Sequence, residues 1–173
     1  MAPGERAADR AYRRVRQAAI GIEFGGDVLK PHEVRSIERL VAAGEKLAWI
    51  PRLKSEPTHD FVWINRGGIH VELKSTIPKH STIRGAIEKS VSKAASHDWC
   101  PLVKENFVID IADAALTSEL RADLAGYNTG RHRWRIRRLW VLLQEVLLET
   151  KERGVVPPRR GGAPRSYHYE PDP

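Results

Sequence analysis

Residues 60–74, DFVWINRGGIHVELK, contain two short apolar runs on either side of a turn. DFVWI at 60–64 and IHVEL at 69–73 have the alternation and the β-branched and aromatic content that are typical of strands. The sequence NRGG at 65–68 lies between them, and glycine accepts the positive φ angles that a tight turn requires. We therefore predict an antiparallel hairpin.

Three charged residues on this hairpin suggest chemistry: Asp60, Glu72 and Lys74. Side chains alternate between the two faces of a strand, so Glu72 and Lys74 share a face with His70. A hairpin centred on residues 66 and 67 places Asp60 opposite Glu72 or Lys74. Two adjacent carboxylates repel unless a proton or a divalent cation lies between them, and Mg²⁺ accepts both carboxylate and phosphate oxygens. With Lys74 orienting water or neutralising charge on phosphorus, the trio predicts phosphodiester cleavage. Alternating charges on a strand are also typical of a solvated face.

Helical and strand patterns alternate on both sides of the hairpin. Predicted helices span 32–45, 82–96 and 113–126, and further predicted strands span 46–50, 106–111 and 136–143. The order αβββαβαβ predicts an α/β fold in which helices flank a mixed β-sheet.

Glu33 lies on the apolar stripe of the predicted 32–45 helix, together with Ile37 and Leu40. An acid on an apolar face is costly, and a role in the site would explain it. The alternative is a structural role, since an acid near a helix N-terminus interacts favourably with the helix dipole and caps the first turn.

Composition indicates one basic domain. The 173 residues are 41% hydrophobic with a net charge of +7, which favours a polyanionic partner such as nucleic acid. We expect the domain at 31–150, preceded by a basic helix or linker at 1–30 and followed by a flexible tail rich in Pro, Gly and Arg at 151–173. No apolar run is long enough to predict membrane insertion.

Basic residues cluster in two places along the chain. The stretch RHRWRIRR at 131–138 has alternating arginines, and further basic residues surround the helix after the hairpin. The predicted nucleic-acid-binding residues are Lys79, Arg84, Lys93, Arg131, Arg133 and Arg135. The alternative for the arginine stretch is an edge strand protected by charge against aggregation.

The ordered set of elements resembles the PD-(D/E)xK nuclease superfamily. The resemblance covers about residues 30–145: a helix with Glu33, the strand KLAWI, then Asp60, then VELKS, a helix and the strand NFVIDI. The pattern is most similar to the C-terminal tRNA nuclease domains of contact-dependent growth inhibition (CdiA-type) toxins. The resemblance implies a restriction-endonuclease-like core. It also implies that Asp60 and Glu72 are ligands of Mg²⁺ or another divalent cation, that Lys74 is the catalytic lysine, and that Glu33 joins the site. His59 stands where the family's motif usually has proline.

These observations lead to three functional hypotheses. The first is a metal-dependent, toxin-type nuclease that hydrolyses RNA, with tRNA favoured, acts in the cytoplasm and has an acidic immunity protein as partner. The second is a DNA endonuclease of the same superfamily, because the fold does not fix the substrate. The third is a nucleic-acid-binding adaptor without catalytic activity, in which case binding is strongly salt-dependent and no cleavage occurs. The sequence indicates no delivery route.

Overall fold

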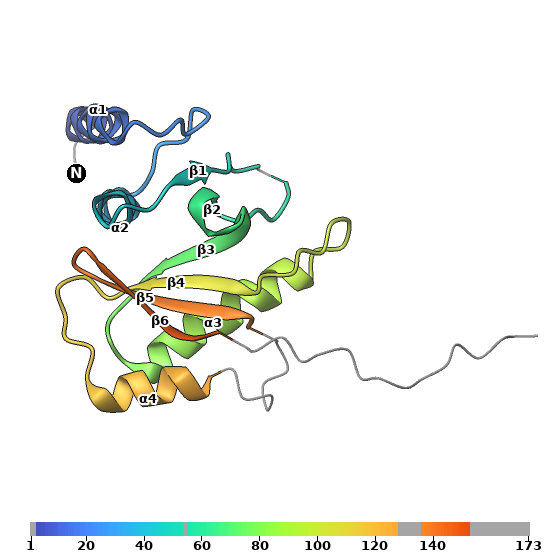
Figure 1. The fold of residues 1–173 in the computed structure, drawn as a ribbon. Helices are drawn as coiled ribbons and strands as arrows, with labels where there is room; N and C mark the ends of the chain where they lie inside the picture. The colour runs from blue at the N-terminus through green and yellow to red at the C-terminus, as the bar shows by residue number, and fades with distance from the viewer. Residues whose placement is uncertain (1–2, 54, 128–135, 153–173) are drawn as a thin grey trace, which may run out of the picture.

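A six-stranded β-sheet with helices on both faces forms the framework of the protein (Figure 1). The computed structural model describes residues 3–53, 55–127 and 136–152. The elements are α1 (Pro3–Ile20), α2 (Pro31–Ala42), β1 (Leu47–Trp49), β2 (Phe61–Trp63), the 3₁₀ turn η1 (Ile64–Arg66), β3 (Ile69–Ser75), α3 (His80–Ala95), β4 (Asn106–Asp110), α4 (Ser118–Gly126), β5 (Arg138–Leu143) and β6 (Val146–Glu152). No helix within these described ranges is long and apolar enough to cross a membrane.

The sheet is mixed, and its strands lie side by side in chain order. β1, β2 and β3 form an antiparallel meander, β3, β4 and β5 are parallel, and β5 and β6 are antiparallel. Parallel neighbours need crossover connections, and these contain α3 and α4. The predicted hairpin is present, with Phe61 opposite Val71, and its turn includes Gly67 at φ 82°. The predicted α/β fold with a mixed, helix-flanked sheet is confirmed.

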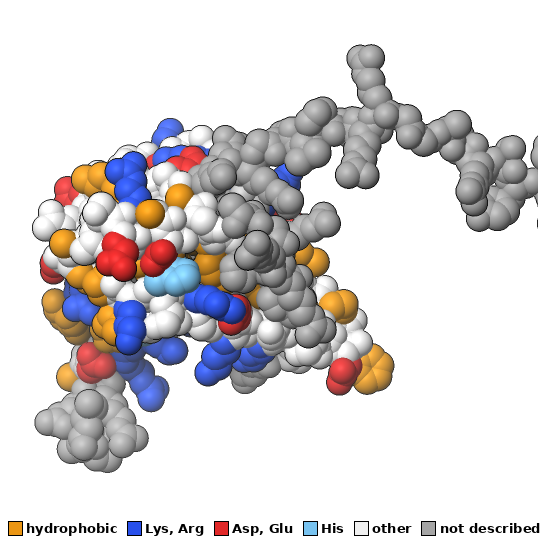
Figure 2. Space-filling view, turned by 90° about the horizontal axis from the view of Figure 1, so that it is seen from below, with side chains coloured by type: hydrophobic (Ala, Val, Ile, Leu, Met, Phe, Trp, Pro, Cys, Tyr) orange, Lys and Arg blue, Asp and Glu red, His pale blue; other side chains and the backbone are white. Residues whose placement is uncertain are grey.

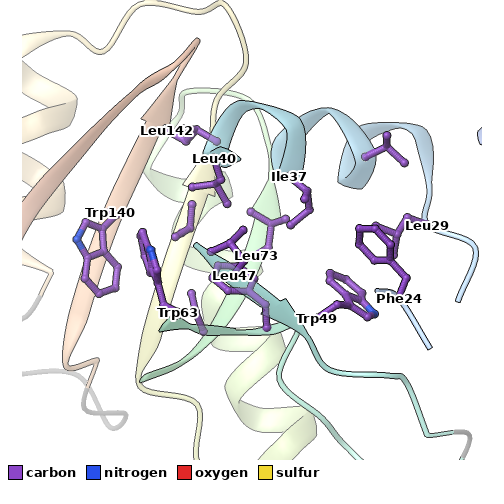
Figure 3. Close-up of a cluster of buried hydrophobic side chains, with 14 residues drawn as sticks. Phe24, Leu29, Ile37, Leu40, Leu47, Trp49, Trp63, Leu73, Trp140 and Leu142 are labelled. Atoms are coloured by element: carbon purple, nitrogen blue, oxygen red, sulfur yellow. The ribbon is translucent and has the colours of Figure 1, made fainter. Parts of the chain in front are cut away.

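Two apolar clusters fill the two faces of the sheet. The first lies under α2, where the fully buried Trp63 and Trp140 have ring centroids 4.8 Å apart (Figure 3). The second lies between the sheet and the helices α3 and α4, and includes Ile87, Phe107 and Leu124. Because each face is covered, any charged side chain on a central strand must find a partner within the protein.

The N-terminal segment is a helix that docks on α2. Arg16 forms an ion pair with Glu38 through two guanidinium nitrogens. The Gln17 side chain donates to the carbonyl of Asp27 and accepts from the backbone N–H of Leu29, at 3.0 and 3.1 Å. Of the two alternatives for residues 1–30, the structure has the docking helix.

Three local features differ from the sequence-based expectations. α4 begins at Ser118 rather than at 113, because the Thr117 side chain accepts from the N–H of Leu120 and caps the helix there. β6 was not predicted, since its charged and polar residues weaken the strand pattern, and it pairs with β5 at the sheet edge. β6 also includes the first two residues of the predicted tail, 151 and 152; residues 153–173 lie outside the described part of the chain.

Candidate active site

The hairpin brings three of the four predicted catalytic residues, Asp60, Glu72 and Lys74, to one face of the sheet; the fourth, Glu33, lies on α2. On β3, Val71 and Leu73 contribute to the cluster under α2, so Glu72 and Lys74 lie on the opposite face, toward α3. Asp60 immediately precedes β2, and its Oδ2 accepts a hydrogen bond of 2.8 Å from the backbone N–H of Leu73. The register that pairs Phe61 with Val71 therefore places Asp60 across from Glu72, as the sequence predicts.

Glu72 is held by three donors. Its Oε1 accepts from Lys74 Nζ and from the Ser90 hydroxyl, the latter at 2.7 Å, and its Oε2 accepts from Lys104 Nζ. The side chain is 5% exposed. Burial favours the neutral acid, but the charges and hydrogen bonds of Lys74 and Lys104 outweigh it and hold the pKa of Glu72 below its ordinary value. Glu72 is therefore ionised at neutral pH.

The same surroundings shift the pKa of Asp60 upward, in the opposite direction from that of Glu72. Burial and the nearby negative charge of Glu72 raise the pKa of Asp60 to about 6, and Lys74 together with the Leu73 N–H offsets only part of this. The two carboxylates are thus electrostatically coupled. A cation between them would relieve the repulsion that raises the Asp60 pKa.

A pocket of about 710 Å³ opens over these carboxylates. Its walls come from α3, from the segment between β1 and β2, and from Lys104 just before β4. Among the described residues, the charged side chains of the lining are six cations and three acids: Lys30, Arg52, Lys74, Lys89, Lys93 and Lys104, with Glu56, Asp60 and Glu72. The excess of positive charge suits an anionic ligand such as a nucleic-acid backbone.

Glu33 reaches the site through Arg52. Its Oε2 accepts from the backbone N–H of Lys30 at 2.7 Å, which caps the first turn of α2, and its Oε1 accepts from Arg52 Nη2 at 2.7 Å. The same Arg52 nitrogen lies 3.8 Å from Asp60 Oδ1. Burial opposes ionisation of Glu33, but the hydrogen bonds from Arg52 and Lys30 hold its pKa below the ordinary value. Glu33 therefore caps the first turn of α2, as the structural alternative expects, and contacts an arginine that lines the pocket; its participation in the chemistry stays a prediction.

The predicted nucleic-acid-binding residues separate into three groups. Lys93 lines the pocket. Lys79 and Arg84, near the start of α3, do not line it, and Arg84 forms an ion pair of 2.7 Å with Glu88. The face on the side of α3 and α4 carries Lys and Arg in separate groups with acidic side chains between some of them (Figure 2). Arg131, Arg133 and Arg135 lie outside the described residues.

The rings of His59 and His70 lie beside the site, with centroids 5.2 Å apart and ring planes tilted by 36°. Burial, with the charge of Lys104, lowers the pKa of His59 to about 4. Its Nδ1 is buried without a hydrogen-bond partner among the described residues. His59 is therefore neutral at neutral pH and carries no charge into the pocket.

Three residues of the site were missed by sequence reasoning: Ser90, Arg52 and Lys104. A signal existed for Ser90, because it lies on the apolar stripe of α3 between the buried Ile87 and Ala94. Arg52 and Lys104 belong to irregular segments, where periodicity carries no information about side-chain direction.

The oxygen atoms of the Asp60 and Glu72 carboxylates are the type of ligand that a hard divalent cation prefers. Within the described residues, no three His, Cys, Asp or Glu side chains gather into a group that holds a metal ion by themselves. Mg²⁺, however, is usually held by one or two carboxylates, with waters and substrate phosphates as its other ligands. Asp60 and Glu72 supply such a pair, and the negative charge of Glu72 is, after burial, the second cause of the raised pKa of Asp60.

Comparisons of the chain with models of protein families, with curated proteins and with solved structures give no match. An α/β fold alone does not identify an activity, because one fold hosts many functions. A functional assignment therefore depends on the geometry and chemistry of the pocket.

Proposed function

We propose that this protein is a metal-dependent nuclease that hydrolyses phosphodiester bonds in RNA, with tRNA as the favoured substrate. The observation that carries the proposal is the convergence of Asp60, Glu72 and Lys74 in one pocket whose lining is otherwise rich in lysine and arginine. A carboxylate pair beside an amine is the set of groups that metal-assisted phosphodiester cleavage requires. The resemblance of the motif order to tRNA nuclease domains adds the preference for RNA.

Each residue of the pocket has a distinct role in this proposal. Asp60 and Glu72 would hold Mg²⁺ or another divalent cation, which supplies Lewis-acid polarisation of the phosphoryl group and a water of lowered pKa. Lys74 contacts Glu72 and is 26% exposed, so its ammonium faces the pocket and neutralises charge that develops on phosphorus. Lys89 and Lys93 extend the positive wall along α3 and bind the neighbouring phosphates.

The RNA preference and the toxin role depend on the resemblance rather than on the pocket. Positive charge binds either polymer, because phosphate contacts carry no sequence or sugar information. A toxin of this kind would need an acidic immunity protein, and a pocket with excess positive charge is a suitable surface for one, since complementary charges speed association.

The experiment that tests the function compares conservative pocket variants. Asp60→Asn, Glu72→Gln and Lys74→Met should each abolish Mg²⁺-dependent cleavage of tRNA while far-ultraviolet circular dichroism stays native. Lys46→Met is the matched control, since this exposed lysine lies just before β1 and outside the pocket lining, and it should retain activity.

Two results would point elsewhere. Cleavage of linear or supercoiled DNA with tRNA left intact would support the DNA endonuclease hypothesis. Salt-dependent binding of nucleic acid with no cleavage of any substrate, with or without Mg²⁺, would support the non-catalytic adaptor and contradict the proposed function.

A further inference from the structure

A second lysine, Lys104, lies in the pocket beside the residues of the predicted motif. Its Nζ donates to Glu72 Oε2, on the opposite carboxylate oxygen from Lys74. Its side chain is only 8% exposed, and among the described residues Glu72 is the one acid within ion-pair distance of it. A buried ammonium is costly without a partner, so the pairing with Glu72 is what makes this position of Lys104 stable.

The charges at the floor of the pocket are already balanced by the protein itself. When both carboxylates are ionised, Asp60 and Glu72 carry two negative charges, and Lys74 and Lys104 carry two positive charges beside them. A pair of carboxylates without such partners would attract a divalent cation strongly. Here an entering cation meets two ammonium groups on the same glutamate, and its charge is not compensated until a further anion arrives.

We propose that Lys104 is a positioning residue that serves as an internal counter-cation: it holds Glu72 in the metal-free protein and competes with a divalent cation for that carboxylate. This inference rests on the proposed metal-dependent function. The two lysines differ in exposure, because Lys74 is 26% exposed toward the pocket whereas Lys104 is buried. Lys74 is therefore able to turn from Glu72 toward a bound substrate, whereas Lys104 keeps its contact with the Glu72 carboxylate.

One consequence concerns the order in which ligands bind. A nucleic-acid phosphate brings the negative charge that the cation needs, so the cation and the nucleic acid increase each other's affinity. The metal alone binds weakly. The contact between Lys104 and Glu72 would therefore keep the site free of bound metal in the absence of nucleic acid.

The test measures Mg²⁺ binding directly, without cleavage as the readout. Isothermal titration calorimetry at pH 8 is run on the full chain, as wild type and as Lys104→Met, Lys104→Arg and Lys93→Met. Lys104→Met should bind Mg²⁺ about tenfold more tightly than wild type, because a unit positive charge beside the metal ligands has been removed. Lys104→Arg keeps the charge and should resemble wild type. Lys93→Met removes the same charge from the pocket wall, where the structure gives Lys93 no ion pair with Asp60 or Glu72, and should change the affinity by less than about twofold.

The outcomes separate this inference from the proposed function. If Lys104→Met does not fold by circular dichroism, Lys74→Met carries the same test, because Lys74 is more exposed and contacts the other oxygen of Glu72. It too should bind Mg²⁺ more tightly. Equal Mg²⁺ affinities in wild type and in every folded lysine variant would overturn the role of Lys104 and leave the metal-dependent function standing. No Mg²⁺ binding by any of the proteins at millimolar concentration would overturn this inference, because removal of a counter-cation should reveal the metal site. The proposed function fails separately, if tRNA stays intact in Mg²⁺ in the cleavage assay.

Discussion

Replacing Asp60 by asparagine should stabilise the metal-free protein at neutral pH although it removes a predicted metal ligand. Asp60 is ionised at pH 8 in a largely buried position, 18% exposed, next to another negative charge, and this lowers the stability of the folded state. Asparagine removes the charge and keeps an oxygen that can accept from the Leu73 N–H. A gain in stability at the expense of function is the expected behaviour of a strained site.

The size and the sign of this effect follow from the Asp60 pKa. The pKa is raised from 3.8 to about 6 on folding, so the folded state binds more protons than the unfolded state between these values. The free energy of unfolding therefore falls as the pH rises through this window, and the full cost is present above pH 6. A shift of this size corresponds to about 3 kcal/mol at most, and we expect Asp60→Asn to recover about 1–3 kcal/mol at pH 8.

Urea denaturation in EDTA at pH 4 and pH 8 measures this difference. The advantage of Asp60→Asn over wild type should be small at pH 4 and largest at pH 8. Asp98→Asn is the matched control, because Asp98 is exposed and should give little change at either pH. An Asp60→Asn protein that is no more stable than wild type at pH 8 would show that the ionised Asp60 does not destabilise the folded state.

Further predictions concern the core and the surroundings of the site. Trp63→Ala should cost about 3–5 kcal/mol in urea denaturation, because Trp63 is fully buried in the core; a loss below about 1 kcal/mol would contradict this packing. Glu33→Ala should lower the free energy of unfolding by about 1 kcal/mol, since a cap and the Arg52 ion pair are lost, and an unchanged value would contradict the contacts. His59 should titrate near pH 4 in NMR spectra rather than near 6.5. Because the unfolded state takes up this proton first, the free energy of unfolding should fall as the pH falls from 6.5 to about 4.

The order of the elements was predictable because each has a strong local signal. The glycines at 67 and 68 and the flanking apolar runs identified the hairpin, and its register then placed Asp60 near Glu72. The apolar period of α3 identified its buried face through Ile83, Ile87 and Val91, despite Gly85 within the helix. β6 could not be recognised in this way, because it is stabilised by pairing with β5 rather than by its own pattern.

The partners within the site were harder to predict than its acids. Lys104 lies 32 residues from Glu72 along the chain, and its position depends on the parallel pairing of β3 and β4. The position of Arg52 depends on the path of the irregular segment between β1 and β2. Tertiary contacts of this kind have no local sequence signature, so the net charge of the chain indicates a positively charged binding surface but not the residues that line it.

One cleavage assay tests directly whether this protein is a metal-dependent nuclease. Purified protein is incubated with total tRNA and with plasmid DNA, each in Mg²⁺ or in EDTA, beside an Asp60→Asn/Lys74→Met double variant that keeps the net charge of the pocket. Wild type should cause Mg²⁺-dependent loss of tRNA, and the double variant should cause none. Intact tRNA and plasmid in all wild-type reactions, or equal cleavage by the double variant, would contradict the proposed function.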